Sequence, residues 1–199
     1  MSYVDDVLWK SYVMCTIQYV LELVARINRF AGPVFAGLYA GVLLALLVLE
    51  LELRLFDGSV YTRVAQVNLI GIPWLAGAAL IPAMLCAALS VLLTIRRPGP
   101  ARWWALAALI LLLIVFTISS AVNVQITAAE GRWNVSSPPF DWRVQRDRWQ
   151  VAHAVRTAAS IAAFLCLSML GFAGSRGDAT DSQPGTRCAP VGPRAGVPE

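Results

Sequence analysis

The chain has 199 residues, of which 58% are hydrophobic and 14% charged, and its mean hydropathy is +0.64. Soluble domains are about 45–50% apolar and about 25% charged, so this composition excludes an ordinary soluble enzyme. The net charge of +4 comes from 16 basic residues that are scattered between apolar runs and form no cluster. We therefore expect the lipid bilayer as a partner, and no nucleic acid.

The chain begins with an amphipathic segment, residues 1–30, in which apolar residues recur at helical spacing. Gln18, Glu22 and Arg26 form an opposite polar stripe that would be costly at the centre of a bilayer. This pattern predicts an interfacial helix lying on the membrane surface, and a fifth spanning helix is the alternative. Asp5 and Asp6 precede the apolar residues, so we expect the N-terminus to be retained and not cleaved as a signal peptide.

Four apolar stretches follow that are long enough to cross a bilayer, whose core takes about 20 residues of helix. They cover residues 31–49, 70–95, 103–126 and 152–172. Gly37 and Gly41 form a GxxxG pattern that favours close helix packing, and Pro73 and Pro82 indicate a kinked second helix inside a bundle. The predicted fold class is all-α: a four-helix transmembrane bundle over residues 31–175, with the N-terminal surface helix and a disordered Gly, Pro and Ser-rich tail at 176–199.

The basic residues near the helix ends predict the orientation. Nine of them fall on the side of the two termini and six on the other side, which predicts that both termini are cytoplasmic. Fifteen of the 16 basic residues are arginine, and together with the Ala-rich runs this is typical of a GC-rich bacterial genome. We therefore expect an integral protein of the bacterial cytoplasmic membrane. The connection from Thr127 to Asp147 is the longest between spans, so it is a candidate lid.

Polar residues gather at the start of the fourth span. Trp149, His153 and Arg156 are spaced i, i+4, i+7 and share one helix face, and Thr157 follows them. Asn123 near the end of the third span, and Glu50 and Glu52 at the exit of the first, lie at a similar depth on the same side. An ionisable residue at membrane depth needs a partner, so we predict a polar site of Asn123, His153, Arg156 and one of the two glutamates. The alternative is structural: a belt tryptophan, a snorkelling arginine and a histidine that joins two helices.

Metal ligands are scarce in the chain. The cysteines at 15, 86, 166 and 188 show no CxxC pair, and the chain has a single histidine. We therefore predict free thiols and no metal site.

Three stretches together resemble the anthrone oxygenase-like family of small four-helix membrane proteins. They are Gly37 to Asn68, the pair Asn123-Val124, and Trp149-x3-His153-x2-Arg156-Thr157, and the resemblance covers residues 31–175. Gln125 and Ile126 stand where a proline and a second asparagine are often found in the family.

The resemblance implies oxygenation of a polyketide anthrone to a quinone with O2 and without a cofactor. In this scheme His153 is the base, Arg156 and Asn123 hold the enolate or phenol oxygens, and Trp149 is a stacking wall. Glu50, Glu52 and Thr157 complete the substrate-binding set. The partners implied are an apolar aromatic molecule and O2.

Two other classes of protein remain open at this stage. A small transporter component would use the polar residues as a pathway across the bilayer. A non-catalytic assembly or scaffold subunit would use them as interhelical hydrogen bonds, and a homo-oligomer is a further arrangement that the sequence leaves open.

Overall fold

The computed structural model describes residues 3–96 and 99–180, which form helices and no β-strand. In chain order the elements are α1 (Tyr3–Glu52), the 3-10 turn η1 (Leu53–Leu55), α2 (Gly58–Asn68), α3 (Ile72–Thr94), α4 (Ala101–Ile118), the π-helical segment η2 (Ser119–Asn123), α5 (Val124–Glu130) and α6 (Trp142–Thr180). The segments α4, η2 and α5 follow one another directly and make one long helix. The predicted all-α class is confirmed.

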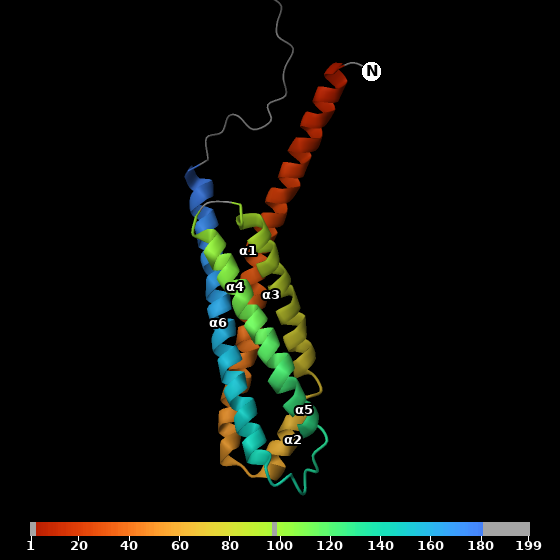
Figure 1. Cartoon of the computed structure of the whole chain (residues 1–199), viewed down its shortest axis with the longest axis vertical. Coiled ribbons are helices and arrows are strands. Elements are labelled where there is room, and N and C mark those ends of the chain that lie inside the picture. The colour runs from red at the N-terminus through yellow and green to blue at the C-terminus, as the bar shows by residue number, and fades with distance from the viewer. Residues whose placement is uncertain (1–2, 97–98, 181–199) are drawn as a thin grey trace, which may run out of the picture.

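Four helices of the described chain are long and apolar enough to cross a membrane. They are Trp9–Leu55, Ile72–Thr94, Ala101–Glu130 and Trp142–Gly171. They stand side by side in Figure 1, with α1 packed on α3 and α6, and α4 packed on the same two helices. The start of α1 and the end of α6 lie at one end of the bundle, here called the terminal end, and α2 and α5 lie at the other, the α2 end. The predicted four-helix bundle is confirmed.

Small side chains hold the helices of the bundle close together. Ala79, Ala83 and Ala87 of α3 and Ala105 and Ala108 of α4 are at most 1% exposed. Their short side chains let the helix backbones approach one another, which is the usual basis of helix packing in lipid. The GxxxG pattern has the same effect at one of its two positions. A Cβ at residue 37 would lie 3.1 Å from the Phe164 ring, whereas one at residue 41 would meet open space.

The first helix is longer than the sequence predicts. Residues 3–30 are helical, but α1 continues to Glu52 without the predicted boundary at residue 30. Hydropathy indicates which residues of a helix face lipid, and it does not indicate where the helix ends. The polar stripe of residues 3–30 therefore does not separate them from the apolar residues that follow in the same helix. The position of residues 3–30 relative to a bilayer stays a prediction.

The second half of the chain is more helical than its hydropathy indicates. The helix α5 continues to Glu130 and α6 begins at Trp142, so the candidate lid of residues 127–147 is reduced to a connection of residues 131–141. Four charged residues between 143 and 148 lower the hydropathy of the first turns of α6 and hide the true start of the helix. At its other end α6 reaches Thr180, beyond residue 176 where the predicted tail begins, and the rest of that tail, with Cys188, lies outside the described residues.

Candidate active site

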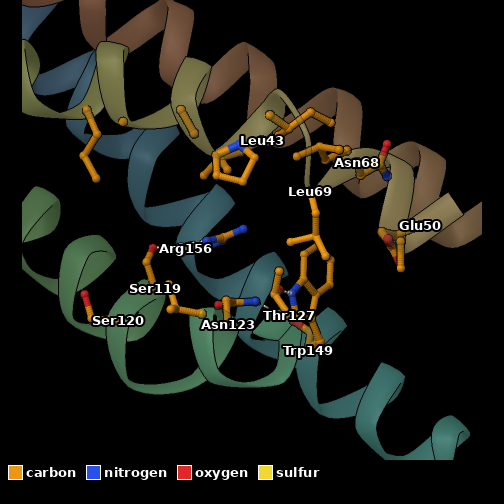
Figure 2. A pocket seen from close by; sticks show the side chains of 18 of the residues that line it. Leu43, Glu50, Asn68, Leu69, Ser119, Ser120, Asn123, Thr127, Trp149 and Arg156 are labelled. Atoms are coloured by element: carbon orange, nitrogen blue, oxygen red, sulfur yellow. Dashed lines mark hydrogen bonds between the residues drawn. The ribbon is translucent and has the colours of Figure 1, made fainter. Parts of the chain in front are cut away.

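A cavity of about 270 Å³ lies toward the α2 end of the bundle, lined by residues of α1, α2, α3, α4, η2, α5 and α6. Figure 2 shows it from close by, with the side chains that line it. Most of its wall is apolar, and includes Leu43, Leu46, Leu80 and Phe116. The polar residues on the wall are Tyr39, Glu50, Asn68, Ser119, Ser120, Asn123, Thr127, Glu130, Trp149 and Arg156. An apolar pocket with a few polar groups is the usual form of a small-molecule site.

The helix α6 brings an aromatic ring, an imidazole and a guanidinium together. Trp149 and His153 stack with their ring centroids 4.6 Å apart and their planes 13° apart. The guanidinium carbon of Arg156 lies 5.7 Å from the centroid of the Trp149 ring. Since the three residues follow at i, i+4 and i+7, the helical repeat places them on one face, as the sequence predicts.

His153 is completely buried, and both of its ring nitrogens have partners. Its Nε2 lies 2.9 Å from the carbonyl oxygen of Leu43, on α1. A carbonyl can only accept, so Nε2 carries the proton and Nδ1 is the acceptor. Arg156 donates to this Nδ1 from its Nε at 3.1 Å, and its Nη2 lies 2.7 Å away. The imidazole is thus neutral and joins α1 to the guanidinium, and it does not line the cavity.

Arg156 is the charged group that α6 presents to the cavity. Its Nη1 donates to Ser119 Oγ at 3.1 Å, so His153 and Ser119 hold the guanidinium from two sides. Within the described part of the chain no carboxylate lies at ion-pair distance from Arg156, and Glu50 is bound by Gln150 instead. A fixed guanidinium in an apolar wall is a ready site for a ligand oxygen that carries negative charge.

The π-helical segment η2 sets the opposite wall of the cavity. The backbone N–H of Val124 donates to the carbonyl of Ser119, five residues earlier. This wider turn places Ser119, Ser120 and Asn123 along the cavity, and π-helical turns are frequent at functional sites.

Asn123 offers the cavity a hydrogen-bond acceptor. Its Nδ2 donates to the carbonyl oxygen of Trp149 at 3.2 Å, which fixes the orientation of the amide because that carbonyl can only accept. Its Oδ1 is buried and accepts no hydrogen bond from the described residues. A buried acceptor without a partner costs free energy, so a ligand hydroxyl that donates to it would be favoured. Figure 2 shows Asn123 between Ser119 and Thr127, and Trp149 Nε1 donates to Thr127 Oγ1 at 2.9 Å.

Two buried carboxylates lie on the cavity wall nearer the α2 end. Glu130, 3% exposed, accepts a hydrogen bond of 2.7 Å from the Tyr61 hydroxyl. Glu50, 4% exposed, receives Gln150 Nε2 at 3.3 Å on its Oε2, and the same Nε2 donates to the Glu50 carbonyl at 2.9 Å. Burial and the charges of Glu130 and Glu50 raise the pKa of the Tyr61 phenol. Tyr61 therefore stays protonated and donates.

The structure brings five of the seven predicted site residues to one place: Asn123, Trp149, His153, Arg156 and Glu50. Glu52 is exposed at the end of α1 and does not line the cavity, because it lies two residues past Glu50 on another face of the helix. Thr157 is buried and caps the His153 carbonyl at 2.7 Å, away from the cavity wall. The described residues contain no group of three side chains that could hold a metal ion.

Sequence reasoning missed Tyr61, Ser119 and Glu130. Glu130 had a usable signal, since Asn123, Thr127 and Glu130 repeat at i, i+4 and i+7 just as the residues of α6 do. Tyr61 lies in the stretch Gly37 to Asn68 that resembles the family, but the hydropathy pattern predicts no element there, so nothing placed its side chain at the site.

Fold and site together define a small polytopic membrane protein whose helices enclose a cavity with a guanidinium and buried acceptors on its wall. Residues 73–166 match the model of the anthrone oxygenase family, which confirms the resemblance for this part of the chain. The matched range holds Asn123, Glu130, Trp149, His153 and Arg156. No curated protein and no solved structure gives a significant match.

Proposed function

We propose that this protein oxygenates a flat, phenolic aromatic ketone of the anthrone type, turning a ring CH2 group into a carbonyl with O2 and without a cofactor. The observation that carries the proposal is the guanidinium of Arg156, which faces an apolar cavity without a carboxylate partner among the described residues. The similarity of residues 73–166 to the anthrone oxygenase family supports the same reaction class.

The chemistry needs few protein groups. Loss of one proton from the CH2 leaves its electron pair delocalised onto the ketone oxygen as an enolate. The enolate passes one electron to O2, and the carbon radical and superoxide combine to a peroxide. Loss of the second CH2 hydrogen as a proton, with cleavage of the O–O bond, gives the new carbonyl and water. One CH2 and one O2 thus yield one C=O and one H2O.

The cavity supplies the contacts that this reaction requires. Arg156 binds the ketone oxygen and stabilises the negative charge that develops on it as the proton leaves. Asn123 Oδ1 accepts a hydrogen bond from a phenol hydroxyl, and the Trp149 ring forms a flat wall for the aromatic rings. Arg156 and Asn123 thus bind the polar groups of the substrate, which would have no hydrogen-bond partner on the apolar part of the wall.

His153 has a different role from the base that the resemblance implies. Its Nε2–H is bound to Leu43 and its Nδ1 to Arg156, so neither nitrogen is available to a molecule in the cavity. We therefore assign it as a positioning residue that holds the guanidinium against the cavity wall.

The cellular setting that we propose follows the sequence. The basic residues near the helix ends favour cytoplasmic termini, and the composition favours a bacterial cytoplasmic membrane. In that orientation the cavity lies toward the outer face, within reach of apolar molecules dissolved in the lipid. The natural substrate would then be a phenolic polyketide.

The test is oxygenation by the purified protein in lipid nanodiscs. Anthrones oxidise slowly in air, so heat-inactivated protein in the same nanodiscs measures the background. We expect quinone formation well above background, one O2 consumed per quinone, one atom of 18O from 18O2 in the new carbonyl, and full activity after chelation. Rates equal to the background for anthrone and its hydroxylated derivatives would reject the enzyme and favour the scaffold or transporter class. Loss of activity on chelation would reject the cofactor-free mechanism.

A further inference from the structure

We infer that Glu130, held by Tyr61 and accompanied by Glu50, is the group that accepts the proton from the substrate carbon. This inference rests on the proposed function, which requires a base but leaves it unassigned. It also assigns a role to the two buried carboxylates that the binding contacts do not use.

Most groups at the cavity can be excluded as the base that accepts the substrate proton. His153 has no free nitrogen and does not line the cavity. Arg156 already carries a proton, and a tyrosine hydroxyl such as that of Tyr39 is protonated near neutral pH. Among the described residues on this wall, Glu50 and Glu130 are the remaining groups that can take a proton.

The hydrogen bonds distinguish the two carboxylates. Glu50 is fastened by the Gln150 amide, which binds both its side chain and its backbone carbonyl. Each carboxylate receives a described donor on one oxygen only, but Glu130 is held more firmly: Tyr61 donates to its Oε1 at 2.7 Å, whereas Gln150 lies 3.3 Å from Glu50 Oε2. A carboxylate that is oriented by one oxygen keeps the other for a substrate hydrogen.

The position of Glu130 in the cavity also fits a base. Asn123, Thr127 and Glu130 all line the cavity from one face of the η2 and α5 helix. Seven residues of helix rise separate Asn123 from Glu130, roughly 10 Å along the axis, and helical side chains lean back toward the N-terminus. From this general tilt we infer that the Glu130 side chain leans toward Asn123, and both residues line the same cavity as Arg156. A tricyclic molecule whose oxygen meets Arg156 extends in the direction of Glu130.

An independent observation marks this cavity as a ligand site. The Asn123 side chain is buried in the same wall and its Oδ1 has no partner among the described residues. The carboxylates thus share their cavity with an acceptor that the protein itself leaves unsatisfied.

The proton transfer is balanced within this cluster. The substrate C–H bond breaks, an O–H bond forms on Glu130 Oε2, and the electron pair moves to the ketone oxygen bound by Arg156. After O2 has added, the same carboxyl returns this proton to the peroxide, and the carboxylate that is restored takes the second CH2 proton as the O–O bond breaks and hydroxide leaves. The carboxyl then gives this proton to the hydroxide, which forms water and restores the carboxylate for the next turnover. Glu50, Tyr61 and Arg146 are the titratable groups whose charges act on this region. Two neighbouring carboxyls disfavour double ionisation, so Glu50 can hold the proton between turnovers.

The experiment separates proton removal from oxygenation. Under argon, transfer of deuterium from D2O into the substrate CH2 reports the base alone. We compare Glu130→Gln, which keeps an oxygen for the Tyr61 hydroxyl, with Glu52→Gln, which makes the same change on an exposed glutamate outside the cavity. Glu130→Gln should lower both exchange and turnover by about 100-fold or more, the usual worth of a positioned base. Glu52→Gln should match the wild type, and both variants should bind the quinone product.

Each outcome decides a different question. An active wild type together with wild-type exchange in Glu130→Gln overturns the assignment of Glu130 and leaves the proposed function standing. A wild type that neither exchanges nor oxygenates rejects the proposed function itself. Should Glu130→Gln fail to fold, Glu130→Asp keeps the carboxylate but withdraws it from the cavity, and exchange at the wild-type rate in that variant would also overturn the assignment.

Discussion

Each end of the bundle buries an asparagine, and the two asparagines differ in their hydrogen bonds. At the terminal end Asn28 of α1 donates to Ser90 Oγ at 2.8 Å and to the Cys86 carbonyl at 3.1 Å, both on α3. At the α2 end Asn123 binds the Trp149 carbonyl and leaves its Oδ1 without a partner among the described residues. Both side chains are less than a tenth exposed. Burial alone therefore does not distinguish a structural polar residue from a candidate binding residue. The distinguishing feature is a buried polar atom without a hydrogen-bond partner, here Asn123 Oδ1.

The same contrast extends to the surroundings. Alanines of α3 and α4 close the middle and terminal parts of the bundle, whereas a π-helical turn, a cavity and an arginine without a carboxylate partner occur together near the α2 end. These features each cost stability. Their concentration in one place supports our proposal that the α2 end is the binding site, whereas the contacts of the terminal part hold the helices together.

The largest effect is expected at Arg156. Arg156→Lys keeps the charge but loses the planar guanidinium that contacts His153, Ser119 and the ligand at once. We expect kcat/KM for anthrone oxygenation to fall by about 100- to 1000-fold, as for loss of an oxyanion donor. Arg148→Lys, on an exposed position of the same helix, is the control and should change little. Equal rates in the two variants would remove the guanidinium from the mechanism.

The next effect separates the two roles considered for His153. His153→Ala should lower kcat by about 100-fold, because a misplaced guanidinium is as harmful as a lost one. His153→Gln should retain most of the activity, since its amide can accept from Arg156 and donate to the Leu43 carbonyl. Its pH–rate profile should keep the wild-type shape. An amide cannot accept the substrate proton, so a Gln variant as inactive as Ala would restore His153 as the base.

A smaller effect should appear when each asparagine is replaced by alanine. Asn28→Ala removes two bonds between helices and should lower the free energy of unfolding by about 0.5–2 kcal/mol, with unchanged kinetics. Asn123→Ala removes one hydrogen bond, to the Trp149 carbonyl, together with the unsatisfied Oδ1, so it should lower stability less than Asn28→Ala. It should weaken binding of hydroxylated quinones relative to their methyl ethers. Thermal unfolding in nanodiscs and ligand titration measure the two quantities. Equal loss of stability in both variants, with no change in ligand preference, would show that both asparagines are structural.

The sequence predicts features that recur at regular spacing, and it misses contacts that depend on how the helices pack in space. Apolar lengths predict four spans, and the spacing of Trp149, His153 and Arg156 predicts one shared face. The start of α6 is missed because a charged residue there is nearly buried: Arg146 is 9% exposed and lies over the Trp142 ring of the same helix, 5.2 Å from its centroid. The partners of His153 are missed for another reason. Leu43 contributes a backbone carbonyl, and no side-chain pattern can indicate that.

The smallest effect concerns the short helix that carries Tyr61. Asp57 caps α2 by accepting hydrogen bonds at 3.0 Å from the backbone N–H groups of Val60 and Ser59 and at 2.7 Å from the Ser59 hydroxyl. These bonds lower the pKa of the exposed Asp57 carboxyl below its usual value of 3.8. A lowered pKa stabilises the fold at any pH above the unfolded value, and this contribution disappears as the pH falls through the folded value.

Asp57→Asn keeps an acceptor for the cap but cannot titrate, whereas Asp57→Ala removes the cap. Near neutral pH we expect a slightly lower unfolding temperature for Asp57→Ala and a nearly normal one for Asp57→Asn. Below pH 3.8 the wild type should lose part of its advantage over Asp57→Ala and approach Asp57→Asn, because a protonated carboxyl still offers an acceptor. Because α2 holds Tyr61 against Glu130, Asp57→Ala should also lower turnover slightly. A difference between wild type and Asp57→Ala that persists unchanged in acid would mean that the carboxylate charge contributes nothing to the cap. Equal stability of the two proteins at every pH would mean that α2 is held by its packing on Trp142, where a Cβ at residue 58 would come within 2.9 Å of the indole ring.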